Sequence, residues 1–299
     1  MVLLLVCAVA NAQETPDQTK DSSRVTKNDV DTIRIGNLII IKKTVSSTEG
    51  HSTTKEIAID KCCKPLKKPL TNVSTNWLIV DLGFTNYVDR TNYAAATAGN
   101  ILVNKPGTGY PLGESDFKLN AAKSVNVNIW FFMQRLNLVK HHINLKYGLG
   151  MELNNYRFRS DISFKQPGYA PYSATNAITN AYIIRDSINF SKNKLAADYV
   201  TIPLMINFCS KPGDPKKGLS ISAGVSAGYL YSQRNKQVSK ERGKLKNKGD
   251  YDMEQFKFCY IAEVGLGPVR LYGSYAPSSI FQKGLNLRPY TVGIRLSNW

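Results

Sequence analysis

The stretch from residue 256 to residue 275 constrains the fold more than any other part of the chain. It reads FKFCYIAEVGLGPVRLYGSY, and apolar residues recur at every second position on both sides of a central turn. A period of two is that of a β-strand, so the stretch predicts an antiparallel hairpin with one apolar face. With Leu266 and Gly267 as the loop, Glu263 is expected directly opposite Arg270 on the less apolar face.

The same alternation recurs from residue 76 onward and predicts eight strands. Besides the two strands of the hairpin, the predicted segments are residues 77–87, 117–133, 142–158, 199–208, 219–232 and 288–299. Pro203 lies inside one of them and predicts a bulge, because proline lacks the backbone donor. No segment of comparable length has the helical period. The predicted fold class is therefore all-β, an eight-stranded antiparallel up-and-down barrel.

The composition of the two strand faces indicates which side of the predicted barrel is the interior. The less apolar face is dominated by Gly, Ser, Asn and Thr, which suit the narrow interior of an eight-stranded barrel. A water-facing exterior would carry more Lys and Glu. The apolar face is therefore expected to contact lipid, as in a transmembrane barrel. Trp77, Trp130 and Trp299, with several tyrosines, are expected to form girdles at the membrane interfaces.

The predicted connections between strands alternate between short and long. The short ones are residues 134–141, 209–218 and 266–267, and the long ones are residues 88–116, 159–194, 233–250 and 276–287. Outer-membrane barrels have short periplasmic turns and long extracellular loops. Both termini are therefore expected in the periplasm.

The first 75 residues have a different character. Residues 1–12 combine a short apolar run with Ala10-Asn11-Ala12, the pattern of a signal peptide cleavage site. Residues 13–75 are polar and predict a mostly flexible periplasmic arm. Within the arm, residues 32–43 fit either a short hairpin or an apolar patch in a linker. The barrel is expected over residues 76–299.

The net charge of +17 suits nucleic acid, but the export signal argues against such a partner. After removal of the signal peptide, four cysteines remain: Cys62, Cys63, Cys209 and Cys259. An exported protein permits a disulfide, for example one joining Cys209, and free thiols are the alternative.

No pattern of catalytic residues is present in the sequence. The chain has three histidines, and the adjacent His141 and His142 lack a Cys or acidic partner at the spacing of metal ligands. The motifs GxSxG, HExxH and the P-loop are also missing from the sequence. We therefore expect no enzyme, no metal and no cofactor.

Charged residues on the inward face are candidates for a network of ion pairs. They are Asp81, Lys146, Glu152, Glu263, Arg270 and Arg295. The first and last strands of a closed barrel are neighbours, so Asp81 and Arg295 are expected to meet, as are Glu263 and Arg270. Buried charges are tolerated only when they are paired. The network either plugs the lumen or lines a narrow ion path.

The connection at residues 233–250 is strongly basic. Its cations are Arg234, Lys236, Lys240, Arg242, Lys244, Lys246 and Lys248. An outward-facing loop of this kind is expected to contact lipopolysaccharide phosphates, and a solvated loop is the alternative.

Several strand sequences resemble the outer-membrane β-barrel (PorT-like) family of Bacteroidota, which shares the architecture of the OmpA-type barrel. They are WLIVDLGFTNY, KSVNVNIWFF, INLKYGLGMELNNYRF, YVTIPLMINF and the closing YTVGIRLSNW. The resemblance implies an outer-membrane location, insertion by the barrel-insertion machinery and contact with outer-membrane lipid. It favours a structural or interaction component of the envelope, for example one accessory to a secretion or envelope assembly, with an envelope partner bound through the N-terminal arm. A small passive channel is the alternative.

Overall fold

The computed structural model describes residues 30–35, 38–43, 57–60, 70–104, 110–169, 178–213, 217–267 and 269–297. The chain divides into two compact units, Met1–Lys68 and Pro69–Trp299. In the part that is described, no helix is long and apolar enough to span a bilayer.

The described part of the first unit is a three-stranded antiparallel sheet. Its strands are β1 (Val30–Ile35), β2 (Leu38–Lys43) and β3 (Ile57–Asp60), in that order. Ile35 pairs with Leu38, so β1 and β2 form a hairpin. Of the two interpretations of residues 32–43, a short hairpin or an apolar patch in a linker, the structure has the hairpin. Most of the predicted flexible arm lies outside the described residues.

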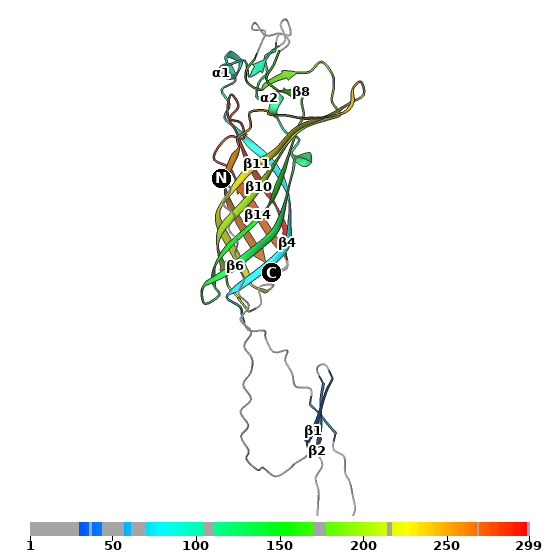
Figure 1. The fold of residues 1–299 in the computed structure, drawn as a ribbon, viewed down its shortest axis with the longest axis vertical. Coiled ribbons are helices and arrows are strands. Elements are labelled where there is room, and N and C mark those ends of the chain that lie inside the picture. The colour runs from blue at the N-terminus through cyan, green and yellow to red at the C-terminus, as the bar shows by residue number, and fades with distance from the viewer. Residues whose placement is uncertain are drawn as a thin grey trace, which may run out of the picture. The chain divides into compact units, whose positions relative to one another are not determined.

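Eight strands of the second unit close into a ring (Figure 1). They are β4 (Val73–Asp89), β6 (Val125–Val139), β7 (Ile143–Phe158), β10 (Lys192–Cys209), β11 (Leu219–Ser239), β13 (Phe256–Leu266), β14 (Val269–Tyr275) and β15 (Leu287–Leu296). Each strand pairs antiparallel with the next, and β15 pairs with β4 to close the ring. The prediction of an all-β antiparallel fold is confirmed. A closed ring leaves no unpaired strand edge, which is what a strand structure in lipid requires.

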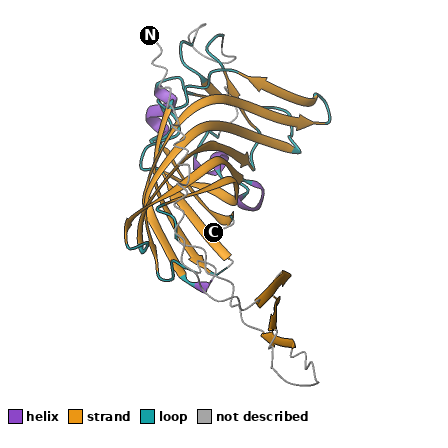
Figure 2. Ribbon diagram, turned by 60° about the horizontal axis from the view of Figure 1, so that its bottom comes forward, coloured by secondary structure: helices purple, strands orange, loops and turns teal. Residues whose placement is uncertain are grey.

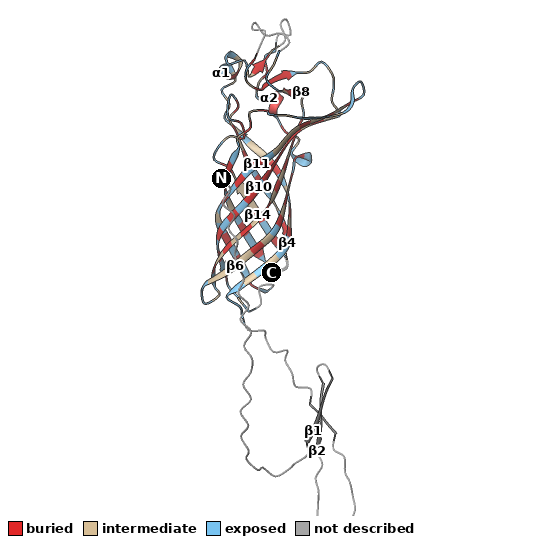
Figure 3. Ribbon diagram, in the orientation of Figure 1, coloured by how far each residue is buried: buried red, intermediate tan, exposed pale blue. Residues whose placement is uncertain are grey.

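Exposed and buried residues alternate along the ring strands (Figure 3), and many of the exposed ones are large and apolar. The buried positions of these strands include many polar and charged side chains. On β13, Phe258 and Tyr260 are 59% and 60% exposed, whereas Cys259 between them is 4% exposed. We call this outer surface the apolar band; it includes Leu82, Phe84, Ile202, Leu204, Ile206, Ile221, Val225, Tyr229, Phe256, Phe258, Tyr260, Leu271, Val292 and Ile294. An exposed apolar surface that runs over successive strands marks contact with lipid or with a partner.

The observed strands differ clearly from the prediction at three places. The fourth ring strand, β10, begins at Lys192 instead of residue 199. The second strand begins at Val125 instead of residue 117, because residues 114–123 form the short helix α2 (Glu114–Phe117) and the 3-10 turn η1 (Ala121–Lys123). The basic residues 233–250 are largely strand instead of loop. β11 continues to Ser239 and turns into β12 (Gly243–Lys248), which pairs with it.

The hairpin of β13 and β14 has a different register from the predicted one. Leu266 pairs with Val269, so the loop begins at Gly267, one residue later than predicted. Gly267 has a φ of +61°, a left-handed conformation that glycine adopts without strain. The partner of each β13 residue therefore moves two positions along β14 from the predicted one.

An irregularity between β4 and β6 changes which side chains point outward. Leu78 has a φ of +53°, and both Leu78 and Phe131 are skipped in the pairing of the two strands. These extra residues allow Trp77 and Leu78 to be exposed in succession, while Ile79 returns to the interior with 1% exposure.

The described parts of three long connections fold over one end of the ring, and we call residues 90–104, 110–124, 159–169, 178–191 and 276–286 the cap. It contains α1 (Tyr93–Ala98), β5 (Leu102–Val103), α2, β8 (Ile162–Lys165) and β9 (Tyr182–Arg185). The helical turns lie in the connections and the strands form the ring (Figure 2). The cap has an apolar core in which Phe164 stacks on Phe281, with ring centroids 6.0 Å apart. The predicted long loops are therefore an ordered structure over most of their described length.

Candidate functional site

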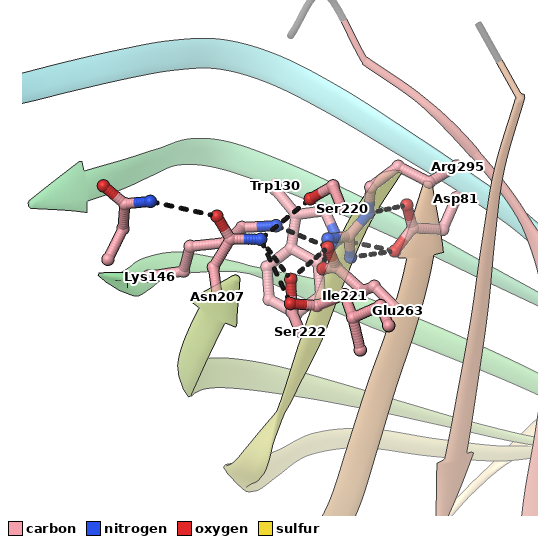
Figure 4. A network of polar contacts seen from close by, with 10 residues as sticks. Asp81, Trp130, Lys146, Asn207, Ser220, Ile221, Ser222, Glu263 and Arg295 are labelled. Carbon is pink, nitrogen blue, oxygen red and sulfur yellow. Dashed lines mark hydrogen bonds and ion pairs between the residues drawn. The ribbon is translucent and has the colours of Figure 1, made fainter. Parts of the chain in front are cut away.

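The inward faces of β4, β7, β13 and β15 bring four charged residues together in the lumen (Figure 4). We call Asp81, Lys146, Glu263 and Arg295 the lower cluster, because they lie toward the short-turn end of the ring. All four side chains are buried, with at most 6% of any residue exposed. Two carboxylates and two cations give the cluster a balanced formal charge.

Asp81 has four donors around its carboxylate. Arg295 donates from Nε to Oδ1 at 2.6 Å and from Nη2 to Oδ2 at 2.7 Å, which is a bidentate pair. Trp130 donates from Nε1 to Oδ2 at 2.7 Å, and Asn128 donates from Nδ2 to the same oxygen at 3.2 Å. Asp81 faces Arg295 on one neighbouring strand and Asn128 on the other, so strand register places these partners.

Glu263 links the remaining charges. Its carboxylate forms ion pairs with the Arg295 guanidinium and with the Lys146 ammonium, and Ser222 donates to it from Oγ at 3.4 Å. Arg295 thus contacts both carboxylates of the cluster. Removal of one partner from such a set leaves a buried charge uncompensated, which is strongly destabilising.

Amide and hydroxyl side chains extend the network from Glu263 along the wall of the lumen. Asn207 donates from Nδ2 to Ser222 Oγ at 3.0 Å and to Ser220 Oγ at 2.9 Å, and Asn144 donates to Asn207 Oδ1 at 3.3 Å. Figure 4 shows Asn207, Ser220 and Ser222 beside Lys146 and Glu263. Small polar residues on the inner face therefore connect the charges to the strands around them.

Arg270 lies on the inner face, but the predicted register that placed it directly opposite Glu263 is wrong. The shifted register places Glu263 opposite Tyr272 and Arg270 opposite Gly265. A Cβ at Gly265 would lie 3.2 Å from Nη1 of Arg270, so the glycine leaves room for the guanidinium. The ion pairs of Glu263 described above come from Lys146 and Arg295.

A second ion pair lies higher in the lumen, between Glu152 on β7 and Lys257 on β13. Asn154 donates from Nδ2 to Glu152 Oε1 at 3.0 Å, and the Lys257 ammonium lies 5.2 Å from the centre of the Tyr199 ring. Lys257 was missing from the predicted network, although it shares strand parity with Glu263 and Cys259. The alternation of inward and outward positions along β13 is the sequence signal that could have identified it.

Trp130 is part of the lumenal filling. It is 5% exposed, and the Arg295 guanidinium carbon lies 5.6 Å from its ring centre. The prediction that Trp130 belongs to an interfacial girdle is therefore wrong, because the strand places this side chain inside. Trp77 is 69% exposed, and Trp299 lies outside the described residues.

Little space remains between the two levels of ion pairs. A cavity of about 30 Å³ is lined by residues of both levels, among them Glu152, Glu263 and Arg295. This volume holds about two water molecules. Above it, the apolar core of the cap includes Tyr156, Tyr199 and Leu287 from the upper ends of the ring strands. The side chains of the described residues thus fill the lumen at successive heights.

The described residues contain no group of three or more His, Cys, Asp or Glu placed to hold a metal ion. Cys209 and Cys259 are buried free thiols, so the predicted disulfide through Cys209 is not formed in this structure. Cys62 and Cys63 lie outside the described residues.

The predicted lipopolysaccharide contacts lie on β11, β12 and the turn between them. Arg234 is held by Asp198 with an Nη1 to Oδ2 distance of 2.5 Å, and Arg242 is held by Asp186 at 3.0 Å. The lysines of the set are exposed or half-exposed: Lys236, Lys240, Lys244, Lys246 and Lys248.

Residues 83–282 match the family described as outer membrane protein beta-barrel domain, and this span is about two-thirds of the 299-residue chain. A comparison with curated proteins found no match. Among solved structures, the chain is similar to the crystal structure of Ail, the attachment invasion locus protein of Yersinia pestis. The identity is 11%, the match covers 74% of this chain and 98% of that chain, and the TM-score is 0.27. On the match to the family, the chain belongs to the outer membrane protein beta-barrel domain family.

Proposed function

We propose that the protein is a non-conducting outer-membrane barrel that serves as a structural or interaction component of the cell envelope. The observation that carries this proposal is the filled lumen. The lower cluster, the Glu152–Lys257 pair and the apolar core of the cap occupy successive heights, with a cavity of about 30 Å³ between the two ion-paired levels. A hydrated ion needs a continuous polar path through the lumen. The buried ion pairs occupy the space where that path would run.

The proposal includes an orientation in the membrane. Short connections at residues 140–142, 210–218 and 267–268 alternate with the long connections that build the cap and β12. Barrels of bacterial outer membranes keep short turns in the periplasm. We therefore assign the cap to the cell exterior and both ends of the chain to the periplasm.

The finer assignment to the PorT-like group of Bacteroidota also belongs to this proposal, as does insertion by the barrel-insertion machinery. Such a protein acts through a partner in the envelope, for example a secretion assembly. The N-terminal residues 13–75 are the proposed contact, because they add a periplasmic unit to a barrel that is already closed. Enzymatic activity is not part of the proposal.

Planar-bilayer recording of the purified full-length protein tests the central claim. We expect no steady conductance, whereas the alternative function, a passive channel for ions or small solutes, requires it. Reproducible single-channel steps from the wild-type protein would overturn the proposal.

The proposed partner is tested separately by affinity purification from detergent-solubilised outer membrane. The full-length protein is compared with a variant that keeps the signal peptide and the barrel but lacks residues 13–68. A partner retained equally by both proteins would exclude the N-terminal region as the contact.

A further inference from the structure

A row of directly opposed cations crosses four strands above the apolar band. Lys194 on β10 faces Arg157 on β7 and Lys236 on β11, and Lys236 in turn faces Lys246 on β12. Like charges at directly opposed positions destabilise a sheet. Four cations in one line therefore lower the stability of the sheet, and neither strand pairing nor packing explains why they are there.

Further cations lie on the same face of these strands. Each lies two positions along its strand from a member of the row: Lys192 on β10, Arg234 on β11, and Lys244 and Lys248 on β12. We call the eight residues together the basic face. Asp198 pairs with Arg234, and the remaining members leave a strong excess of positive charge.

The repulsion within the basic face shows in the pKa of two lysines that lie above the apolar band. Burial, followed by the charges of Lys192 and Lys236, lowers the pKa of Lys194 to about 8. The charge of Lys244 is the largest cause that lowers the pKa of Lys236 from its ordinary value. An anion bound between these lysines would relieve the repulsion.

The basic face continues the outer surface of the barrel. Tyr229 and Tyr231 are exposed on β11, and Tyr231 is skipped where the register with β10 shifts between Asp198 and Tyr199. After this bulge the even-numbered residues of β11 take the outward parity, so Lys236 follows the exposed tyrosines on the same side. At about 3.4 Å per residue, Lys236 lies roughly 17 Å along the strand from Tyr231.

The opposite face of the same strands is held by the cap. Asn193 donates to the carbonyl of Ile162 at 2.6 Å, and Gln237 donates to Ser163 Oγ at 2.8 Å. Both acceptors belong to β8. The anchored amide face fixes the direction of the basic face, which points away from the cap.

We propose that the basic face binds the phosphate-bearing headgroups of the outer-leaflet lipid, with the Arg157–Lys194–Lys236–Lys246 row as its centre. This revises the residue set expected from the sequence. It adds Arg157, Lys192 and Lys194, and it leaves out Arg242, whose guanidinium pairs with Asp186. The proposal rests on the proposed orientation for its choice of leaflet.

The test is a titration of the full-length protein in detergent micelles with bisphosphorylated lipid A and with dephosphorylated lipid A. The row variant combines Lys194→Gln, Lys236→Gln and Lys246→Gln. The matched control combines Lys123→Gln, Lys140→Gln and Lys211→Gln, three exposed lysines elsewhere on the second unit.

We expect the row variant to bind phosphorylated lipid A about 100-fold more weakly than wild type, because each lysine near an anionic surface contributes roughly a factor of five. The control should change the affinity less than about twofold, and added salt should weaken wild-type binding. Equal affinity of wild type and row variant, or equal affinity of wild type for both forms of lipid A, would overturn the proposal.

Thermal unfolding in lipid-free micelles gives a second readout. Neutralising three opposed cations should raise the melting temperature of the row variant above that of wild type, because the repulsion disappears. Phosphorylated lipid A should then stabilise wild type and leave the row variant unchanged. A row variant that melts below wild type without lipid would show that the lysines support the fold, which contradicts the proposal.

Failure of the proposed orientation is distinguished by labelling in intact cells. Lys240→Cys, in the turn between β11 and β12, should react with a membrane-impermeant maleimide from outside. A micelle titration does not depend on this orientation. Lipid A binding without labelling would overturn the outward orientation and the choice of leaflet, while loss of binding with labelling would overturn the lipid site alone.

Discussion

At the scale of single residues, Arg295 holds the lower cluster together. Its guanidinium contacts both Asp81 and Glu263, so its removal leaves two buried carboxylates with fewer cations. We predict that Arg295→Met, which keeps much of the side-chain length, lowers the free energy of unfolding by about 3–5 kcal/mol. Urea unfolding of the protein in micelles measures the change.

The same substitution at Arg185 is the control. Arg185 pairs with Asp116 in the cap at 2.6 Å, but 38% of its side chain is exposed. An exposed pair contributes little, so Arg185→Met should cost less than about 1 kcal/mol. Similar losses at both positions would show that burial of the lower cluster does not set its contribution.

The sequence contains enough information to place these charges on the inner face, and less to pair them. Alternation assigns Asp81, Glu263 and Arg295 to one side of the sheet, and ring closure makes β4 and β15 neighbours. The prediction that Glu263 lies directly opposite Arg270 is wrong because it depended on the exact position of the loop. A loop one residue further along moves every opposed pair by two positions. Lys257 is the opposite case. The alternation of β13 places it on the inner face, but it was not predicted to belong to the network.

At the scale of elements, two glycines open a slot between β4 and β15. Gly83 faces Gly293, and the ring of Tyr272 lies against both. A Cβ on Gly293 would lie 2.3 Å from the Leu82 carbonyl oxygen and 2.6 Å from the Tyr272 ring. We predict that Gly293→Ala destabilises the barrel by about 1–3 kcal/mol, because the strands and the ring must move apart.

Gly213→Ala is the matched control for this substitution. Gly213 lies in the connection between β10 and β11, and no atom lies within 4 Å of a Cβ built there. The change in unfolding free energy at Gly213 should stay within about 0.5 kcal/mol. Comparable effects of the two substitutions in urea unfolding would argue against the close approach of Tyr272.

Elements built by tertiary contacts were harder to predict than the ring. The alternation of residues 117–124 continues that of the strand that follows, yet Phe117 and Leu119 are drawn into the apolar core of the cap and the strand begins later. The irregularity at Leu78 and Phe131 likewise has no local signal, because neither residue is a glycine or a proline. The composition of the basic segment predicts a loop. The segment forms strands instead, because the opposite face of β10 and β11 binds the cap.

At the scale of the whole molecule, the lumen is closed at two levels of different chemistry. The lower cluster and the Glu152–Lys257 pair together close it with ion pairs, and the cap closes its other end with an apolar core. A path for ions requires both levels to open. This architecture separates the present barrel from one in which a single loop acts as the barrier.

We predict the conductance of three variants from this arrangement. The first replaces the four residues of the lower cluster, Glu152 and Lys257 by alanine. The second replaces residues 160–190 of the cap by a short Gly-Ser connection, and the third combines both changes. Each of the first two should stay silent in planar bilayers, because one closed level remains. The combined variant should conduct, and heat-modifiable migration on a gel must show first that each variant is folded. Conductance from the first variant alone would mean that the cap does not seal the lumen, and silence of the folded combined variant would mean that side chains between the two levels close it by themselves.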